Sequence, residues 1–262
     1  MKNQVIWVTG ASSGIGEALA YCLAKNGAKL ILSARRTEEL ERVKTACQLA
    51  DNEIFILPLD LEKSADFRSK VKEAIAYFGK IDILINNGGV SQRSLAKDTA
   101  IEVDRRIMEI DYFGTIALSK ALLPYFLEKK AGKFVVITSL VGKFGTPMRS
   151  AYSAAKHALH GFFDALRAES WKENIKVLIV CPGFVKTQVS VNALVGSGGK
   201  QGTMDNAQAN GMSAEKCAEK ILSAIKKDKE EVYIGGNEVF GVYLKRFLPS
   251  IFSKVLRKAK VT

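Results

Sequence analysis

The chain has 262 residues, of which 47% are hydrophobic and 25% charged, so it can form a sizeable buried core. No apolar run reaches the roughly 18 residues of a membrane-spanning helix. The apolar run at residues 5–8 is likewise too short for a signal-peptide core of about 7–15 residues, so we expect a cytoplasmic protein. The net charge of +12 leaves nucleic acid, a membrane surface and a phosphorylated ligand open as partners.

The cysteines and histidines show no metal-binding pattern. The four cysteines are scattered without CxxC spacing, which predicts reduced thiols. His157 and His160 lie three residues apart on an expected helix, with no third ligand in sight. We therefore predict no metal site and place both histidines on a helix surface.

Apolar, β-branched runs alternate with segments of helical period from the N-terminus onward. Residues 14–26 carry one apolar face, and Gly27 ends this helix. Several other runs are continuously apolar, as buried parallel strands are. The alternation predicts an α/β fold with a single doubly wound parallel sheet, a Rossmann-type three-layer α/β/α sandwich, and residues 1–262 as one domain. Strands are expected at residues 4–9, 29–33, 53–58, 81–86, 133–139, 176–181 and 231–234.

One irregular stretch, at about residues 184–212, is rich in Gly, Ser, Asn and Gln. A loop of this length is either disordered or functional. It follows the sixth expected strand, at the sheet edge where such folds bind ligands. We therefore favour a lid over the substrate.

The first expected strand leads into a glycine-rich turn and a helix. This arrangement directs backbone N–H groups and the positive end of a helix at one point, where a pyrophosphate can bind. Gly10 permits the tight turn, Gly14 admits a phosphate, and Gly16 lets the helix pack close to the strand. The spacing is GxxxGxG rather than GxGxxG, and a purely structural turn is the alternative. The expected dinucleotide contacts are Gly10, Ser12, Ser13, Gly14, Ile15 and Gly16.

The end of the second strand indicates which dinucleotide binds. NAD sites usually carry an acidic residue there, whereas this chain has Ala34, Arg35 and Arg36. Guanidinium groups match a 2′-phosphate in charge and geometry. We therefore predict NADP(H) as the cofactor, with Arg35 as the favoured phosphate ligand. Arg36 is either a second ligand or the start of an exposed helix.

A tyrosine four residues before a lysine is common by chance, so its surroundings matter. Tyr152 and Lys156 share one face of an expected helix, and Ser139 ends the fifth strand at the ligand edge. Here the chain resembles the short-chain dehydrogenase/reductase family over most of its length. The motifs that carry the resemblance, in the family's order, are TGASSGIG at 9–16, Asp60 and Leu61, NNGG at 86–89, Ser139, YSAAK at 152–156, Pro182, Gly183 and Thr187.

The resemblance implies roles for these residues. Tyr152 would donate its phenolic proton to a carbonyl oxygen. Lys156 would stabilise the phenolate and hold the nicotinamide ribose, and Ser139 would polarise the substrate. The protein would position the substrate and the cofactor, and the cofactor would carry the hydride. The further implied cofactor contacts are Asp60, Leu61, Asn87, Gly88, Tyr152, Lys156, Pro182, Gly183, Val185 and Thr187.

One departure from the family is Asp111, in the segment 108–124 where the family usually has an asparagine. That asparagine supports a water-linked proton relay to the lysine. An ionised aspartate accepts hydrogen bonds but donates none, and it would stabilise protonated Lys156. We expect a tolerated variation, with Asp111 as a fourth catalytic residue; loss of activity is the alternative.

The tail at residues 240–262 mixes apolar residues with cations and has no acidic residue. An interfacial amphipathic helix has this composition, as does a terminal segment packed on its own domain or on a subunit partner. Pro249 breaks any single long helix. Peripheral membrane contact therefore stays among the alternatives. The cations are Lys245, Arg246, Lys254, Arg257, Lys258 and Lys260.

The leading hypothesis is an NADP(H)-dependent oxidoreductase acting on the carbonyl or alcohol group of a small molecule. Val141, Phe144, Met148 and Phe184 are expected near the pocket and favour a hydrophobic substrate. A cofactor-binding sensor or scaffold without turnover is the alternative, supported only by Asp111. No nucleic acid is expected, because stacking aromatics are not interleaved with the basic residues outside the tail and no reader motif occurs. The resemblance also implies a homodimer or homotetramer.

Overall fold

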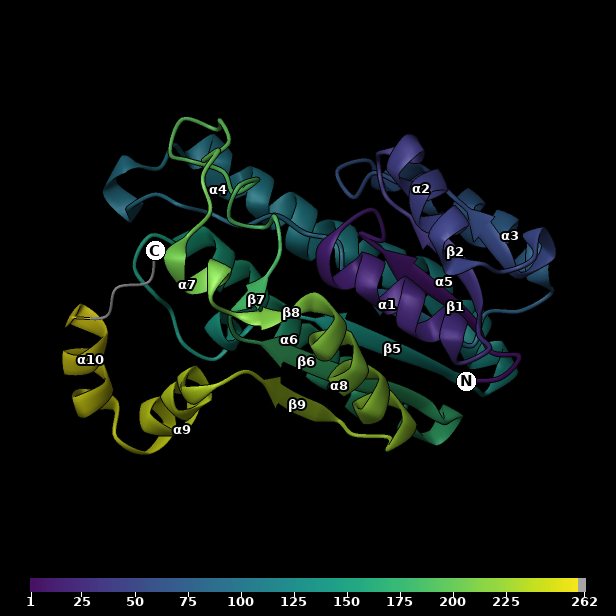
Figure 1. Cartoon of the computed structure of the whole chain (residues 1–262). Coiled ribbons are helices and arrows are strands. Elements are labelled where there is room, and N and C mark those ends of the chain that lie inside the picture. Colours follow the sequence, from purple (N-terminus) through teal and green to yellow (C-terminus); the bar gives the residue numbers. More distant parts are fainter. Residues whose placement is uncertain (259–262) are drawn as a thin grey trace.

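Seven parallel strands form the centre of the molecule in the computed structural model, which describes residues 1–258 (Figure 1). Their order across the sheet is β3-β2-β1-β4-β5-β6-β9. Each corresponds to one of the seven predicted strands, so the predicted parallel α/β sheet is confirmed. The strands are β1 (Val5–Thr9), β2 (Lys29–Ser33), β3 (Ile54–Ile56), β4 (Ile83–Asn86), β5 (Gly132–Ile137), β6 (Ile175–Pro182) and β9 (Glu231–Ile234).

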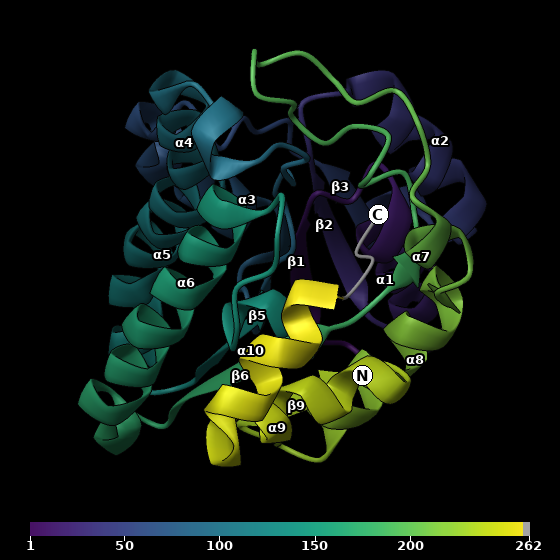
Figure 2. The ribbon, with the colours of Figure 1, turned by 90° about the vertical axis from the view of Figure 1, so that its left-hand side faces the viewer.

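Helices cover both faces of this sheet (Figure 2). On one face pack α1 (Gly14–Lys25), α2 (Thr37–Cys47) and α8 (Ala214–Lys226). On the other pack α3 (Phe67–Phe78), α5 (Thr115–Lys129) and α6 (Ser150–Glu169). The π-helical turn Glu109–Gly114 joins α4 (Ile101–Met108) to α5. The layers are therefore those of the predicted α/β/α sandwich.

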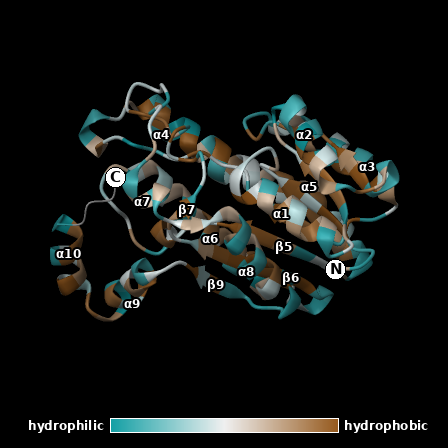
Figure 3. Cartoon of the chain, in the orientation of Figure 1, coloured by the Kyte–Doolittle hydropathy of each residue, from teal (hydrophilic) through white to brown (hydrophobic). Residues whose placement is uncertain are grey.

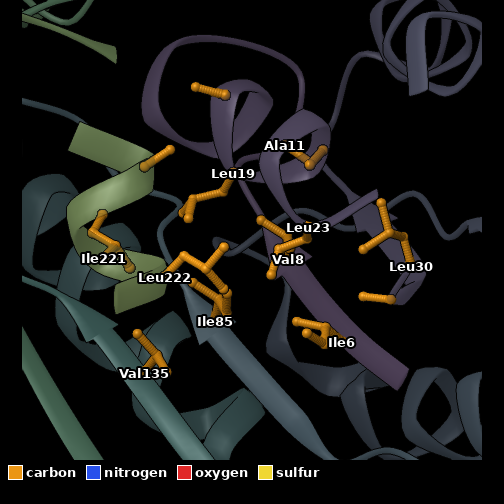
Figure 4. Packing of buried hydrophobic residues seen from close by; sticks show 14 of the residues in the cluster. Ile6, Val8, Ala11, Leu19, Leu23, Leu30, Ile85, Val135, Ile221 and Leu222 are labelled. Carbon is orange, nitrogen blue, oxygen red and sulfur yellow. The ribbon is translucent and has the colours of Figure 1, made fainter. Parts of the chain in front are cut away.

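Alternation along the strands divides the core between the two faces of the sheet. In β1, Ile6 and Val8 pack on the α1 side, whereas Val5 and Trp7 pack on the α5 side. Figure 4 shows Ile6 and Val8 in the same packed group as Leu19 of α1. Because successive side chains of a strand point to opposite faces, a continuously apolar strand is stable only when both faces are covered.

The strand order creates a topological switch between β1 and β4. β1 pairs with β2 on one side and with β4 on the other. The connections that leave β1 and β4 therefore diverge across the sheet. Open α/β sheets bind ligands at the carboxyl ends of their strands, at such a point.

The segment predicted as a lid is mostly irregular but contains short ordered elements. β7 (Val185–Lys186) pairs in parallel with β8 (Met212–Ser213), and α7 (Asn206–Ala209) lies between them. Main-chain hydrogen bonds join Leu194 to the loop after β4, from Leu194 N–H to Ser91 O at 2.8 Å and from Arg93 N–H to Leu194 O at 2.8 Å. The segment therefore packs on the rest of the fold.

The tail forms α9 (Phe240–Phe247) and α10 (Pro249–Lys258), and the break between them falls before Pro249, as predicted. Figure 3 shows that both helices mix hydrophobic and hydrophilic residues. Lys260, the last predicted cation, lies outside the described residues. No helix within residues 1–258 is both long and apolar enough to cross a membrane. The exposed apolar side chains of the tail are Phe240, Tyr243, Phe247, Leu248, Ile251 and Val255.

The prediction of two surface histidines is wrong for His160. His157 is exposed on α6, but His160 is only 7% exposed, and its Nε2 lies 3.2 Å from Thr138 Oγ1. His160 follows the buried Lys156 by four residues, so it lies on the same inward stripe of the helix. Burial, and then repulsion by Lys143, lower the pKa of His160 to about 4.

Candidate active site

A cleft of about 900 Å³ opens at the carboxyl edge of the sheet. Residues that follow four of the strands line it: Gly10 after β1, Asn87 after β4, Ser139 after β5 and Gly183 after β6. The lid and the tail add further walls. The cleft thus brings together the predicted site residues, except that Asp111 and Gly16 are not among the residues that line it.

The turn after β1 packs too closely for side chains. Gly10 has a φ of +64°, and a Cβ there would lie 2.8 Å from Gly88 Cα. A Cβ on Gly16 would lie 2.2 Å from the Gly10 carbonyl oxygen, so α1 begins directly against the turn. Ser13, the N-cap residue of α1, makes no side-chain capping hydrogen bond. The first amides of α1 are therefore not capped by this side chain, and the turn fits a pyrophosphate.

Thr9 and Asn87 join the ends of β1 and β4 beside this turn. The Asn87 backbone N–H donates to Thr9 Oγ1 at 3.0 Å, and Asn87 Nδ2 donates to the Thr9 carbonyl at 3.0 Å. Asp60 and Leu61 line the neighbouring wall. A Cβ on Gly88 would lie 2.8 Å from Leu61 Cδ1, so the Leu61 side chain packs directly against this backbone.

The two arginines after β2, Arg35 and Arg36, contact different parts of the cleft wall. Arg36 Nη2 donates to Ser12 Oγ at 3.1 Å, so its guanidinium lies on the phosphate turn. The Arg35 side chain is 55% exposed, and its Nη1 lies 3.6 Å from Glu62 Oε2. Glu62 also pairs with Arg106 at 3.0 Å. Both Arg35 and Arg36 line the cleft, but Arg36 is the one that contacts the turn.

Ser139, Tyr152 and Lys156 lie together on another wall of the cleft. Lys156 Nζ lies 5.4 Å from the centre of the Tyr152 ring, and Lys156 is only 4% exposed. Ser139 lies just beyond β5 rather than in it, because its Oγ accepts from Val141 N–H at 3.3 Å and caps the next turn. Ser139 Oγ donates to the Pro182 carbonyl at 3.2 Å. A hydroxyl, a phenol and an ammonium thus share one wall, as proton transfer requires.

Asp111 lies behind Lys156, away from the cleft. It is fully buried in the π-helical turn, and its Oδ2 lies 3.1 Å from Lys156 Nζ. Its Oδ1 accepts from Val90 N–H at 2.7 Å. Burial opposes the charge of Lys156, but Asp111 outweighs this effect and holds the pKa of Lys156 above its ordinary value. Asp111, which was predicted as a fourth catalytic residue, is therefore placed against the lysine and not against the cleft.

The segment that follows β6 covers the glycine turn. Pro182 ends β6, and Gly183 leads to Val185 in β7. Thr187 packs on the turn, since a Cβ on Gly14 would lie 3.1 Å from Thr187 Cγ2. All four predicted residues of this segment line the cleft.

A buried ion cluster, which the sequence did not predict, anchors the lid. Arg93, after β4, donates from Nε to Asp205 Oδ2 at 2.7 Å, and Asp205 stands directly before α7. Arg149 Nη2 lies 3.5 Å from the same oxygen, and none of the three side chains is more than 6% exposed. Burial opposes the charge of Asp205, but Arg93 and Gln201 hold its pKa below the ordinary value. The cluster fixes the lid beside the cleft, which both arginines line.

The remaining wall is apolar and comes partly from the tail. Val141, Phe144 and Phe184 line the cleft as expected, whereas Met148 is not among the lining residues. The Phe144 and Phe252 rings lie 5.1 Å apart and join the tail to this wall. The apolar character of the tail could be predicted from the sequence, but its packing against this wall of the cleft could not. The tail residues that line the cleft are Phe240, Gly241, Leu244, Phe252, Val255 and Leu256.

The fold and the cleft define a dinucleotide-binding α/β protein with a serine, a tyrosine and a lysine at its site. The family described as short chain dehydrogenase matches residues 4–195. The chain is 44% identical over 264 residues to the dehydrogenase/reductase SDR family protein 7-like of Anopheles gambiae, an alignment that covers 98% of this chain and 83% of that relative. The chain therefore belongs to the short-chain dehydrogenase/reductase family, whose members are oxidoreductases that bind a nicotinamide cofactor.

Solved structures share the fold. One is a short-chain dehydrogenase/reductase from Burkholderia phymatum in complex with NAD, with a TM-score of 0.85 and 21% identity, covering 95% of each chain. Another is an alcohol dehydrogenase from the archaeon Thermococcus sibiricus complexed with 5-hydroxy-NADP, with a TM-score of 0.77 and 25% identity. The alignment covers 90% of this chain and 97% of that one. These neighbours include complexes with both kinds of dinucleotide.

Proposed function

We propose that this protein is an NADP(H)-dependent oxidoreductase that interconverts a carbonyl and an alcohol on a hydrophobic small molecule. The observation that carries the proposal is the placement of Tyr152 and Lys156 in the same cleft as the glycine turn. A dinucleotide laid across the switch point reaches from the turn to this wall.

The chemistry follows from the groups on that wall. When bound, the nicotinamide supplies or accepts the hydride. Ser139 Oγ turns its hydrogen from the Pro182 carbonyl to the substrate oxygen, and Tyr152 donates its proton to that oxygen in reduction. Lys156 places a positive charge beside the phenol, which makes loss of this proton easier. In oxidation the same groups act in reverse, with Tyr152 accepting the alcohol proton.

The preference for NADP(H) is supported by the end of β2. No acidic residue stands there to accept the ribose hydroxyls, and Arg35 and Arg36 both line the cleft. Arg36 already contacts Ser12, so little ordering is needed for it to meet a 2′-phosphate. The Thermococcus sibiricus neighbour, which is complexed with 5-hydroxy-NADP, agrees with this preference.

A hydrophobic substrate is supported by the apolar wall. Phe144, Phe184, Leu244 and Phe252 line the cleft from three separate segments. Such residues bind apolar groups by removing their surface from water, which is worth about 25 cal/mol per Å².

The first test is a panel of apolar ketones and aldehydes with NADPH, followed by nicotinamide absorbance. Tyr152→Phe should slow turnover by about 10²–10⁴-fold and weaken NADPH binding far less, because only one of many implied cofactor contacts is lost. Tyr112→Phe is the matched control, because Tyr112 packs in the same apolar cluster but does not line the cleft. If the wild type binds NADPH and converts no member of the panel, a sensor or scaffold role replaces the proposed one.

We also propose that the protein is cytoplasmic and contacts anionic membrane surfaces through its tail. Six apolar side chains of the tail are exposed among five described cations, a composition typical of interfacial helices. Phe240→Ser combined with Phe247→Ser should reduce co-sedimentation with anionic vesicles. Tyr77→Ser, which removes an exposed aromatic from α3, should not. Equal co-sedimentation of all three proteins would contradict the membrane contact.

A homodimer or homotetramer is the proposed assembly, as is common in the family. Ile101, Phe113 and Trp171 are exposed on or next to α4, α5 and α6, and we propose that these helices pair between subunits. Sedimentation velocity should show more than one subunit, and Phe113→Ser should shift the species toward a monomer. A monomer at all concentrations would refute the assembly.

A further inference from the structure

The aspartate behind the active-site lysine carries a charge that an asparagine would not. Asp111 and Lys156 form a 3.1 Å ion pair, and both side chains are at most 5% exposed. Val90 N–H donates to the other carboxylate oxygen at 2.7 Å. A Cβ on Gly89 would lie 3.0 Å from Asp111 Oδ1, so the backbone packs tightly around the carboxylate. Burial raises the pKa of Asp111 above its ordinary value, whereas Lys156 and the Val90 amide favour the ionised carboxylate. The contact between Asp111 Oδ2 and Lys156 Nζ is at ion-pair distance, which assigns the pair as charged.

The ion pair of Asp111 and Lys156 changes the electrostatic potential at the Tyr152 phenol. An isolated ammonium beside a phenol favours the phenolate. An ammonium that is already paired with a carboxylate does so less, because the two opposite charges largely cancel at the distance of the phenol. Lys156 Nζ lies 5.4 Å from the centre of the Tyr152 ring, and Asp111 lies on the far side of the lysine. The other charged groups in this region are Arg149 at the start of α6, Asp205 in the lid and Arg93 after β4.

We propose that Asp111 offsets the charge of Lys156 at the Tyr152 phenol, so that the phenol stays protonated to a higher pH than it would with an asparagine at position 111. The inference rests on the proposed function of the Tyr152 wall. In reduction, a hydride adds to the carbonyl carbon, the phenol gives its proton to the oxygen, and the phenolate regains a proton from water. In oxidation the phenolate must take the alcohol proton, so this direction needs the form of Tyr152 that Asp111 disfavours.

The consequence is a displaced pH dependence. Reduction should persist to a higher pH than it would with an asparagine at position 111, because the phenol stays protonated longer. Oxidation should begin only at correspondingly higher pH. The equilibrium of the reaction is unchanged, since the enzyme alters only the rates of both directions at each pH.

The decisive experiment reads the tyrosine directly in the protein without cofactor. Tyrosinate difference absorption is followed against pH in the wild type, Asp111→Asn and Asp111→Ser, and the Tyr152→Phe version of each is subtracted to isolate one of the seven tyrosines. Both substitutions remove the charge, but only asparagine adds an amide that could serve a water relay. We expect Tyr152 to ionise at a lower pH in both variants than in the wild type, because the charge of Lys156 is no longer offset. Asp104→Asn, which removes a carboxylate from the preceding helix, should leave it unchanged.

An unchanged titration in folded Asp111→Asn would overturn the proposal. A rise would also overturn it, because it would mean that Lys156 loses its charge without its carboxylate and that Asp111 promotes the phenolate. A shift in Asp111→Asn alone would assign the effect to the added amide instead of the lost charge. Since this readout needs no turnover, a protein that reduces no carbonyl would contradict the proposed function and still leave the charge effect measurable. If turnover is found, the pH profiles of kcat/KM should move in the same direction as the titration.

Discussion

Replacing Arg36 with alanine should remove more of the preference for NADPH than replacing Arg35. Arg36 Nη2 lies 3.1 Å from Ser12 Oγ on the phosphate turn, so its guanidinium is already placed where a 2′-phosphate would arrive. A hydrogen bond to a charged group contributes about 1.5–3 kcal/mol, which corresponds to roughly 10–150-fold in affinity. The Arg35 side chain is 55% exposed and is already paired with Glu62. Its contribution to NADPH binding should therefore stay near the roughly 1 kcal/mol of an exposed ion pair, which is about fivefold in affinity.

The assay titrates NADPH and NADH separately into wild type, Arg35→Ala and Arg36→Ala, following nicotinamide fluorescence. Wild type should bind NADPH more tightly. Arg36→Ala should weaken NADPH by about 10–100-fold and change NADH little, because NADH has no 2′-phosphate. Glu62→Gln should strengthen NADPH binding by a few fold, roughly the value of an exposed pair, because it releases Arg35.

Arg42→Ala is the matched control, since Arg42 is another half-exposed guanidinium, paired with Glu17 at 2.7 Å and absent from the cleft wall. Equal losses for NADPH and NADH in Arg36→Ala would show that Arg36 shapes the turn and does not read the phosphate. Tighter binding of NADH than of NADPH by the wild type would refute the cofactor assignment itself.

Three further changes test the lid, the buried histidine and the turn. Asp205→Asn should cost about 3–5 kcal/mol of stability, because Arg93 is left as a buried charge without its carboxylate; thermal unfolding measures this loss, and limited proteolysis should cut residues 184–212 faster. The pKa of His160 is about 4 in the folded state against about 6.5 when unfolded, so the unfolded chain binds more protons between these values. Stability should therefore fall as the pH drops from about 6.5 to 4, by about 3 kcal/mol at most, and urea unfolding should show a smaller fall in His160→Gln. Gly16→Ala should abolish NADPH binding and lower the melting temperature, because its Cβ would lie 2.2 Å from the Gly10 carbonyl oxygen.

These three expectations have direct controls. Asp98→Asn, at an exposed carboxylate without a described ion pair, should leave both the stability and the proteolysis rate unchanged. His157→Gln should not alter the slope of stability against pH, and an equal effect of both histidine changes would contradict the burial argument. Gly161→Ala adds a Cβ that meets no atom within 4 Å, so it should be neutral or stabilising by up to about 1 kcal/mol.

Most of the sheet could be read from the sequence because each strand is a local, continuously apolar run. β2 matches its predicted range of residues 29–33, and β9 its range of 231–234. The prediction for the third strand was too long, since β3 covers only Ile54–Ile56. Past β3, Leu57 N–H still donates to the Leu32 carbonyl at 3.0 Å, so the chain stays beside β2 without continuing as a regular strand. The short pair β7 and β8 was missed because two residues in each strand leave no periodic pattern.

The site was predictable where its residues are close in the sequence, and not where the fold joins distant ones. Tyr152 and Lys156 are one helical turn apart, so their shared face follows from the helix alone. Arg93 and Asp205 meet across 112 positions of the chain, and nothing in either neighbourhood indicates the other. The tail shows the same limit, since its apolar pattern predicted an amphipathic helix but not that Phe252 would pack on Phe144.

The strand order also separates the choice of dinucleotide from the proton-transfer step, so that the two can evolve independently. The arginines that we propose to distinguish one dinucleotide from another follow β2, on one side of the switch between β1 and β4, whereas the proposed proton donor and its lysine lie on α6, on the other side. Both groups line the same cleft, and the proposed cofactor would contact both of them. Mutations after β2 can therefore change which reducing pool the protein draws on without disturbing the acid that completes the reaction, and a hybrid chain that exchanges the β1–β2 half alone should inherit one trait and keep the other.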